Sequence, residues 1–101
     1  MDRNEVMEVT IFFHEGLSLT MRKMGFVVKP ARIDPEIVHP FKEQRLKHLL
    51  WMIEESQRLV RDNKIEKAMR WLVFVQGSLW AFNIITIAES TDVNRGDFSK
   101  Y

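Results

Sequence analysis

Apolar residues recur at helical spacing along most of this 101-residue chain. In residues 4–24 they return every three or four positions, beginning at Val6, which is the period of a helix with one buried face. Asp2 precedes this stretch and Gly25 follows it, and both residue types favour helix ends. The segment 10–13 taken alone also fits a strand, but the longer period favours a helix over the whole stretch.

Two further stretches, residues 40–62 and 64–82, predict a long αα-hairpin that turns at Asn63. The first stretch has one apolar stripe, formed by Leu46, Leu49, Leu50, Ile53 and Val60. The second is apolar on three faces, and a helix of that kind must be buried on all sides. Because so short a chain has few elements to bury it, we expect contacts between subunits as well.

Gly77 interrupts the second hairpin helix at its centre. Glycine inside a helix costs about 0.5–1 kcal/mol relative to alanine, so its presence predicts a close approach of another backbone. That backbone belongs either to the same chain or to a second subunit, and the sequence leaves both alternatives open.

Shorter elements complete the predicted fold. The sequence from Asp34 to Val38 predicts a single 3₁₀ or α turn, and Pro40 suits the first position of the next helix. A capping-box pattern starts a short C-terminal helix at about 86–93. We therefore predict an all-α fold, a small helical bundle in which residues 1–93 form a single domain and 94–101 form a flexible C-terminal tail.

Composition narrows the protein class. The chain is 46% hydrophobic, carries a net charge of +1 and has no cysteine, which excludes a disulfide scaffold and a cysteine-based zinc site. Acidic residues near the N-terminus argue against a secretory signal. The uncharged run 71–88 contains Gln76 and Asn83 and is better explained as a buried helix than as a membrane span. We expect a cytoplasmic protein.

No catalytic motif emerges, so the sequence predicts a protein that is not an enzyme and needs no metal or cofactor. The three histidines lack a metal-ligand spacing. The acids Glu54, Glu55 and Glu66 resemble the clusters that hold magnesium in helical nucleotide pyrophosphatases, but a second pair of acids is missing. The tripeptide Arg95-Gly96-Asp97 is most simply a chance occurrence.

Basic and aromatic residues gather where the two hairpin helices begin, and a helix N-terminus favours anions. They predict a small pocket for an anionic ligand such as a nucleotide. The candidate ligand-binding residues are His39, Lys42, Arg45, His48, Lys67, Arg70 and Trp71. The alternative is a solvated face of mixed charge. These basic residues are too few for strong binding to nucleic acid.

Four residues are candidates for an interface with another subunit or a partner protein, because they are either large and aromatic or small enough for close packing. They are Phe12, Trp51, Gly77 and Trp80.

Residues 34–93 contain HPFKEQRLKHLLWMIEE and EKAMRWLVFVQGSLWAFNIITIAE. These segments resemble a family of small proteins of unassigned function encoded by tailed bacteriophages. The resemblance implies expression inside a bacterial host but transfers no site residues. With the candidate pocket, it leads us to expect a homo-oligomeric phage accessory protein, most simply a dimer, that binds a small anionic ligand such as a host signalling nucleotide. The alternative is an inhibitor or adaptor that acts on a host protein.

Overall fold

The computed structural model describes residues 1–98, which form four α-helices. Their bounds are α1 Arg3–Lys23, α2 Lys42–Arg61, α3 Ile65–Ala81 and α4 Ile87–Asn94. No strand occurs within this part of the chain. The predicted all-α bundle is confirmed, and the strand alternative for residues 10–13 is wrong because they lie inside α1.

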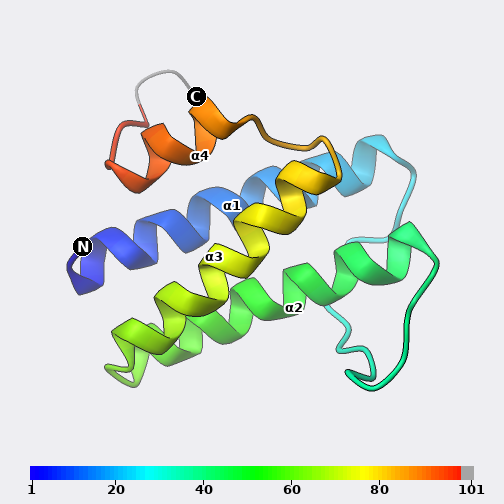
Figure 1. Ribbon diagram of the computed structural model, residues 1–101, viewed down its shortest axis with the longest axis horizontal. Helices are drawn as coiled ribbons and strands as arrows, with labels where there is room; N and C mark the ends of the chain where they lie inside the picture. Colours follow the sequence, from blue (N-terminus) through cyan, green and yellow to red (C-terminus); the bar gives the residue numbers. More distant parts are fainter. Residues whose placement is uncertain (99–101) are drawn as a thin grey trace.

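The helices pack around a hairpin of α2 and α3 (Figure 1). α1 and α2 run antiparallel, and α3 starts at the end of α2 and crosses to the end of α1, while α4 turns back over α1. The contacts of α2 with α3 and with α1 are the most extensive in the bundle. Since α2 packs between the other two long helices, its apolar face forms the centre of the core.

One face of each long helix supplies the core. In α1 and α2 the buried residues lie at the predicted helical spacing, and in α3 they follow only one of its three apolar faces. The buried apolar side chains are Val6, Val9, Phe13, Leu17, Met21, Leu46, Leu49, Leu50, Ile53, Leu59, Val60, Ala68, Leu72, Val75, Leu79 and Val93.

Local sequence sets the helix ends. Gly25, at the predicted end of α1, has φ +78°, and Phe26 N–H donates to the Met21 carbonyl at 2.9 Å, which is a Schellman ending. Asn63 (φ 61°) and Asn83 (φ 59°) end α2 and α3 in the same way. Asparagine tolerates this left-handed conformation because its short polar side chain bonds locally.

Two of the four helix starts, those of α1 and α4, are capped by side chains as predicted. The Asp2 carboxylate accepts from Glu5 N–H at 2.9 Å at the start of α1. At α4, Glu89 N–H donates to the Thr86 hydroxyl at 3.0 Å, and Thr86 N–H donates to the Glu89 carboxylate at 3.2 Å. This reciprocal pair is a capping box, so the sequence correctly located both starts.

Two predictions about the connection between α1 and α2 are wrong. Pro35 lies in a turn stabilised by a 2.9 Å bond from Glu36 N–H to the Asp34 carboxylate, with no helix there. α2 begins at Lys42 and not at Pro40. The physical reason is that the His39 carbonyl, the first acceptor of a helix starting at Pro40, accepts instead from the Arg45 side chain.

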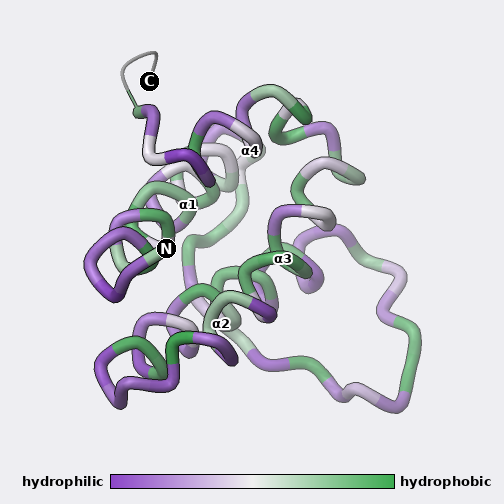
Figure 2. Tube along the Cα trace, turned by 60° about the vertical axis from the view of Figure 1, so that its left-hand side comes forward, coloured by the Kyte–Doolittle hydropathy of each residue, from purple (hydrophilic) through white to green (hydrophobic). Residues whose placement is uncertain are grey.

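The same connection is fastened to α2 at two points. Ala31 N–H donates to the Lys47 carbonyl at 3.1 Å, and Ile33 N–H donates to Nδ1 of His48 at 3.2 Å. Beyond these anchors the connection extends away from the helices and carries several hydrophobic positions (Figure 2). It therefore forms an outer wall beside the start of α2.

The outer side of α3 remains exposed. Val73, Phe74 and Trp80 are all more than half exposed, so within one chain α3 is buried on one face only. A side-chain carbon added at Gly77 would meet no atom of residues 1–98 within 4 Å. Close packing against these residues therefore does not explain this glycine.

The predicted C-terminal tail begins at residue 94, but Asn94 is the last residue of α4. Phe98 packs against Phe12 of α1, with ring centroids 5.4 Å apart. The rest of the predicted tail, residues 99–101, lies outside the described residues. No helix within residues 1–98 has both the length and the apolar character needed to cross a membrane.

Candidate functional site

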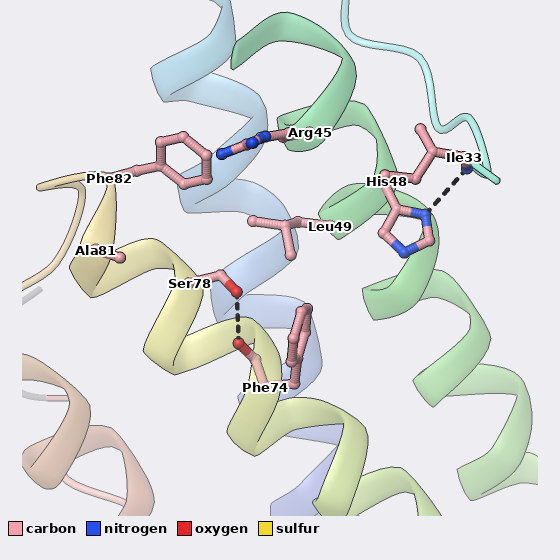
Figure 3. Close-up of a pocket in the computed structure, with 8 residues that line it drawn as sticks. All are labelled: Ile33, Arg45, His48, Leu49, Phe74, Ser78, Ala81 and Phe82. Atoms are coloured by element: carbon pink, nitrogen blue, oxygen red, sulfur yellow. Dashed lines mark hydrogen bonds between the residues drawn. The ribbon is translucent and has the colours of Figure 1, made fainter. Parts of the chain in front are cut away.

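A hollow of about 400 Å³ lies between the start of α2, the end of α3 and the α1–α2 connection (Figure 3). Its lining is mostly apolar and includes two basic side chains. The residues are Ile33, Arg45, His48, Leu49, Phe74, Ser78, Ala81 and Phe82. The hairpin creates this hollow because it is antiparallel, which places the last turn of α3 beside the first turns of α2.

Arg45 provides the fixed charge of the hollow. Its Nε donates to the His39 carbonyl, and the guanidinium points towards the Phe82 ring (Figure 3). Lys42 lies one turn earlier, with its Nζ 5.9 Å from the centroid of the same ring. Within residues 1–98, neither cation forms a salt bridge with a carboxylate. Both remain available to an anion.

His48 lines the hollow on the side of the α1–α2 connection. Its Nδ1 accepts from Ile33 N–H, and its ring stacks on Trp51 with centroids 5.5 Å apart and an interplanar angle of 22°. Because Nδ1 is the acceptor, the proton of the neutral ring is on Nε2. Burial lowers the pKa of His48 below its ordinary 6.5, and the charges of Arg32 and His39 lower it further.

The free energy of unfolding should fall as the pH is lowered from about 6.5 towards the folded-state pKa of His48. The unfolded chain protonates His48 near pH 6.5, whereas the folded chain does so only at lower pH. The unfolded state therefore binds more protons in this window, and stability is lost as the pH falls from 6.5 towards the folded pKa. Urea unfolding at about pH 7.5, 6.5 and 5.5 measures the effect.

The matched variant for this measurement is His48→Asn. An amide oxygen can still accept from Ile33 N–H but does not titrate, so the variant should lack this part of the pH dependence. Parallel stability curves for the two proteins would contradict the assignment to His48.

A second hollow of about 400 Å³ adjoins the first and shares Ile33, His48 and Phe74 with it. Its aromatic wall is formed by Trp51 and Trp71, with ring centroids 5.7 Å apart. The guanidinium carbon of Arg32 lies 5.4 Å from the centroid of the Trp51 ring, a cation–π distance. His48 thus lies between the apolar hollow that contains Arg45 and an aromatic hollow lined by both Arg32 and Asp34.

The structure divides the predicted ligand-binding residues into two groups. Lys42, Arg45, His48 and the His39 carbonyl gather at the start of α2, and Trp71 lines the adjoining hollow. Lys67 and Arg70 line a separate open hollow of about 500 Å³ at the start of α3. The prediction that Lys67 and Arg70 share a pocket with Arg45 and His48 is wrong. The helices are antiparallel, so their starts lie at opposite ends of the hairpin.

The candidate interface residues also separate. Phe12 packs against Phe13 and Phe98, and Trp51 is half-buried between His48 and Trp71. Gly77 and Trp80 are exposed and line a groove between α3 and α4.

Several residues of the site are not among those predicted from the sequence. Phe74 and Ser78 of α3 and Phe82, which directly follows this helix, are four positions apart and line the hollow. Helical spacing therefore offered a means of finding them. Arg32 and Ile33 belong to an irregular connection without periodicity. Their place beside His48 follows from tertiary packing alone.

Two of the three acidic residues that resemble a magnesium cluster, Glu54 and Glu55, each pair with a basic side chain. Glu54 accepts from His14 Nε2 of α1 at 3.0 Å, while Glu55 bonds Arg58 at 2.8 Å. Arg58 thus pairs with Glu55 and Asp62 and not with Glu54, although Glu54 lies four residues before it on the same helix. No cluster of three or more histidine, aspartate or glutamate residues that could hold a metal occurs within the described part of the chain.

Comparisons of this chain with protein-family models, with curated proteins and with solved structures find no match.

Proposed function

We propose that the chain is a non-enzymatic binding protein for a small anion with a flat aromatic group, most simply a nucleotide. The observation that carries the proposal is the hollow at the start of α2, into which Arg45 and His48 both open between apolar and aromatic walls. Ligand sites of this kind are concave and largely apolar, with a few polar groups that fix the ligand's orientation.

Charge favours an anion at the Arg45 end. Arg45 and Lys42 have no carboxylate partner within residues 1–98, and the first turn of α2 has no side-chain cap. Uncapped N–H groups and the helix dipole both favour a phosphate or carboxylate there. Arginine additionally matches such groups with two parallel hydrogen bonds.

The other end of the site favours a flat ring. His48, Trp51 and Trp71 offer aromatic surface beside the Arg32 guanidinium, and a base that stacks on an aromatic side chain gains about 1–3 kcal/mol. The Nε2 atom of His39 is buried without a hydrogen-bond partner within residues 1–98. It adds an unsatisfied polar group near the site.

The resemblance to phage proteins adds a biological role to the proposed ligand binding. A phage protein with this site would sequester a signalling nucleotide of its host and so counter a host defence. The fold and charge of the site support binding, and the resemblance supports the source of the ligand.

A thermal-shift screen of mono-, di- and cyclic nucleotides tests the function. A ligand at 100 times its Kd adds about 2.7 kcal/mol, which raises Tm on the order of 10 °C for a domain of this size. Arg45→Gln should weaken binding about 10- to 100-fold, because a hydrogen bond to a charged group contributes about 1.5–3 kcal/mol.

Arg70→Gln is the matched control, since Arg70 lies in the separate hollow at the start of α3. It should leave binding unchanged. Absence of a shift with every nucleotide class, or equal losses in the two variants, would refute the proposed site.

A second candidate function, binding to a host protein as an inhibitor or adaptor, is favoured by the α1–α2 connection. Ile37, Val38 and Phe41 are exposed there, Val38 by 82%. Exposed apolar groups next to one another mark protein contact sites. An adaptor would show no nucleotide-dependent rise in Tm, and Val38→Ser would weaken its complex.

A further inference from the structure

The aromatic hollow beside His48 contains a carboxylate, that of Asp34. Asp34 directly follows Ile33, whose N–H donates to His48 Nδ1 at 3.2 Å (Figure 3). It precedes Pro35, whose ring fixes the backbone φ at about −65°. The backbone on both sides of Asp34 is therefore restrained, and its side chain lines the same hollow as the aromatic wall.

The Asp34 carboxylate has hydrogen-bonding capacity to spare. Its Oδ1 accepts from Glu36 N–H at 2.9 Å, which forms an Asx turn. Within residues 1–98 it forms no salt bridge. An ionised carboxylate accepts about four hydrogen bonds through its two oxygens. Most of this capacity is therefore available to a ligand that enters the hollow.

A carboxylate beside an anion site restricts which part of the ligand can approach it. Because like charges repel, the phosphate of a nucleotide should lie at the Arg45 end, and the part that reaches Asp34 should carry hydrogen-bond donors. The two hollows share Ile33, His48 and Phe74 and have about 400 Å³ each. Together they lie within the range of about 300–1,000 Å³ that is typical of ligand sites, so one nucleotide can extend from one hollow into the other.

Guanine is the base whose edge best matches a carboxylate. Its Watson–Crick edge presents two adjacent donors, N1–H and the N2 amino group, to the two acceptor oxygens. Adenine and cytosine each present a ring-nitrogen acceptor next to their amino group, and uracil presents one N–H between two carbonyl oxygens. With any of these three bases the carboxylate would face an acceptor.

We propose that Asp34 recognises the Watson–Crick edge of guanine and makes the site selective for guanine nucleotides. The inference rests on the proposed nucleotide binding and adds the identity of the base. Stacking on the aromatic wall gives affinity but distinguishes little between bases. Selectivity comes from Asp34, because a base that brings an acceptor to the carboxylate leaves both groups without a donor.

Isothermal titration calorimetry of the full chain with GMP, IMP and AMP tests the selectivity. GMP should bind about 10- to 100-fold more tightly than AMP, because hydrogen bonds to a charged group are stronger than those between neutral groups. IMP keeps the N1–H donor but lacks the N2 amino group, so its affinity should lie between the other two. All three carry the same phosphate, and the differences therefore report on the base.

Asp34→Asn separates recognition of the base from the structure of the turn. The amide oxygen can still accept from Glu36 N–H, whereas the second carboxylate oxygen becomes an NH₂ donor that cannot accept from guanine. Because an amide can pair with adenine, the preference for GMP over AMP should fall to about one or reverse. Glu36→Gln is the matched control: it removes one negative charge from the same turn, at an exposed side chain that does not line the hollow. It should keep the wild-type preference.

Equal affinities of the wild-type chain for GMP and AMP would overturn the guanine assignment and leave the nucleotide site itself intact. An unchanged preference in Asp34→Asn, or the same fall in Asp34→Asn and Glu36→Gln, would also overturn it. So would the failure of all three nucleotides to bind, whereas the nucleotide site is refuted only by a thermal-shift screen without any shift or by equal losses in Arg45→Gln and Arg70→Gln.

Discussion

Ile53→Ala should lower the free energy of unfolding by about 2–5 kcal/mol. Ile53 is fully buried at 0% exposure, and it lies on α2, which packs against both α1 and α3. The truncation removes buried methyl groups and leaves a cavity that helices on both sides cannot close without moving. Urea unfolding measures the loss, and Tm should fall by at least about 10 °C.

The matched control for this prediction is Ile11→Ala. Ile11 lies in the middle of α1 but is 45% exposed, so its loss leaves no closed cavity. It should change stability by less than about 1 kcal/mol. Similar losses at the two positions would show that the core is not centred on α2.

Gln76→Ala should detach α4 while the rest of the bundle stays folded. The buried Gln76 amide accepts from Ser90 Oγ and from Asn94 Nδ2, both at 3.0 Å, and donates to Asn94 Oδ1 at 2.9 Å. Only one apolar residue of α4, Val93, is buried. The lost bonds are worth about 1–3 kcal/mol, a large part of what holds so short a helix in place.

Hydrogen exchange resolves this effect by position. The α4 amides should lose about 10- to 100-fold in protection, whereas the amides of α1, α2 and α3 should retain theirs. Gln44→Ala replaces an exposed glutamine of α2 and should change neither set. A uniform loss of protection across all four helices would mean that α4 unfolds only with the whole bundle.

Local chemistry explains why the helices were predictable. Gly25, Asn63 and Asn83 each end a helix in the left-handed conformation, which few other residues tolerate. The capping pair Thr86 and Glu89 starts α4 through bonds only three residues apart. Interactions over so few residues depend little on the rest of the chain.

The error at the start of α2 shows where local chemistry stops being sufficient. Pro40 satisfies the rule for a first helical residue, yet the helix begins two residues later. The His39 carbonyl is bonded to the Arg45 side chain, and this bond depends on where the connection and α2 come together. A local preference worth a fraction of a kcal/mol is easily overridden by such a contact.

The candidate site was only partly predictable for a related reason. Arg45 and His48 are three residues apart on one helix, so spacing alone places them together. Lys67 and Arg70 were assigned to the same pocket, but the antiparallel hairpin takes them to its other end. Phe74 and Phe82 complete the site instead, since the end of α3 lies beside the start of α2.

The sequence by itself determined the number of helices, most of their ends, the buried stripes of α1 and α2 and the pair Arg45 and His48. These follow from periodicity and from bonds between near neighbours. Only the tertiary structure decided that Arg32 and Ile33 join His48, that α3 stays exposed around Gly77, and that the basic residues form two groups. Such features depend on how helices pack across long sequence separations, where side-chain shape and chain direction act together and no local pattern records the result.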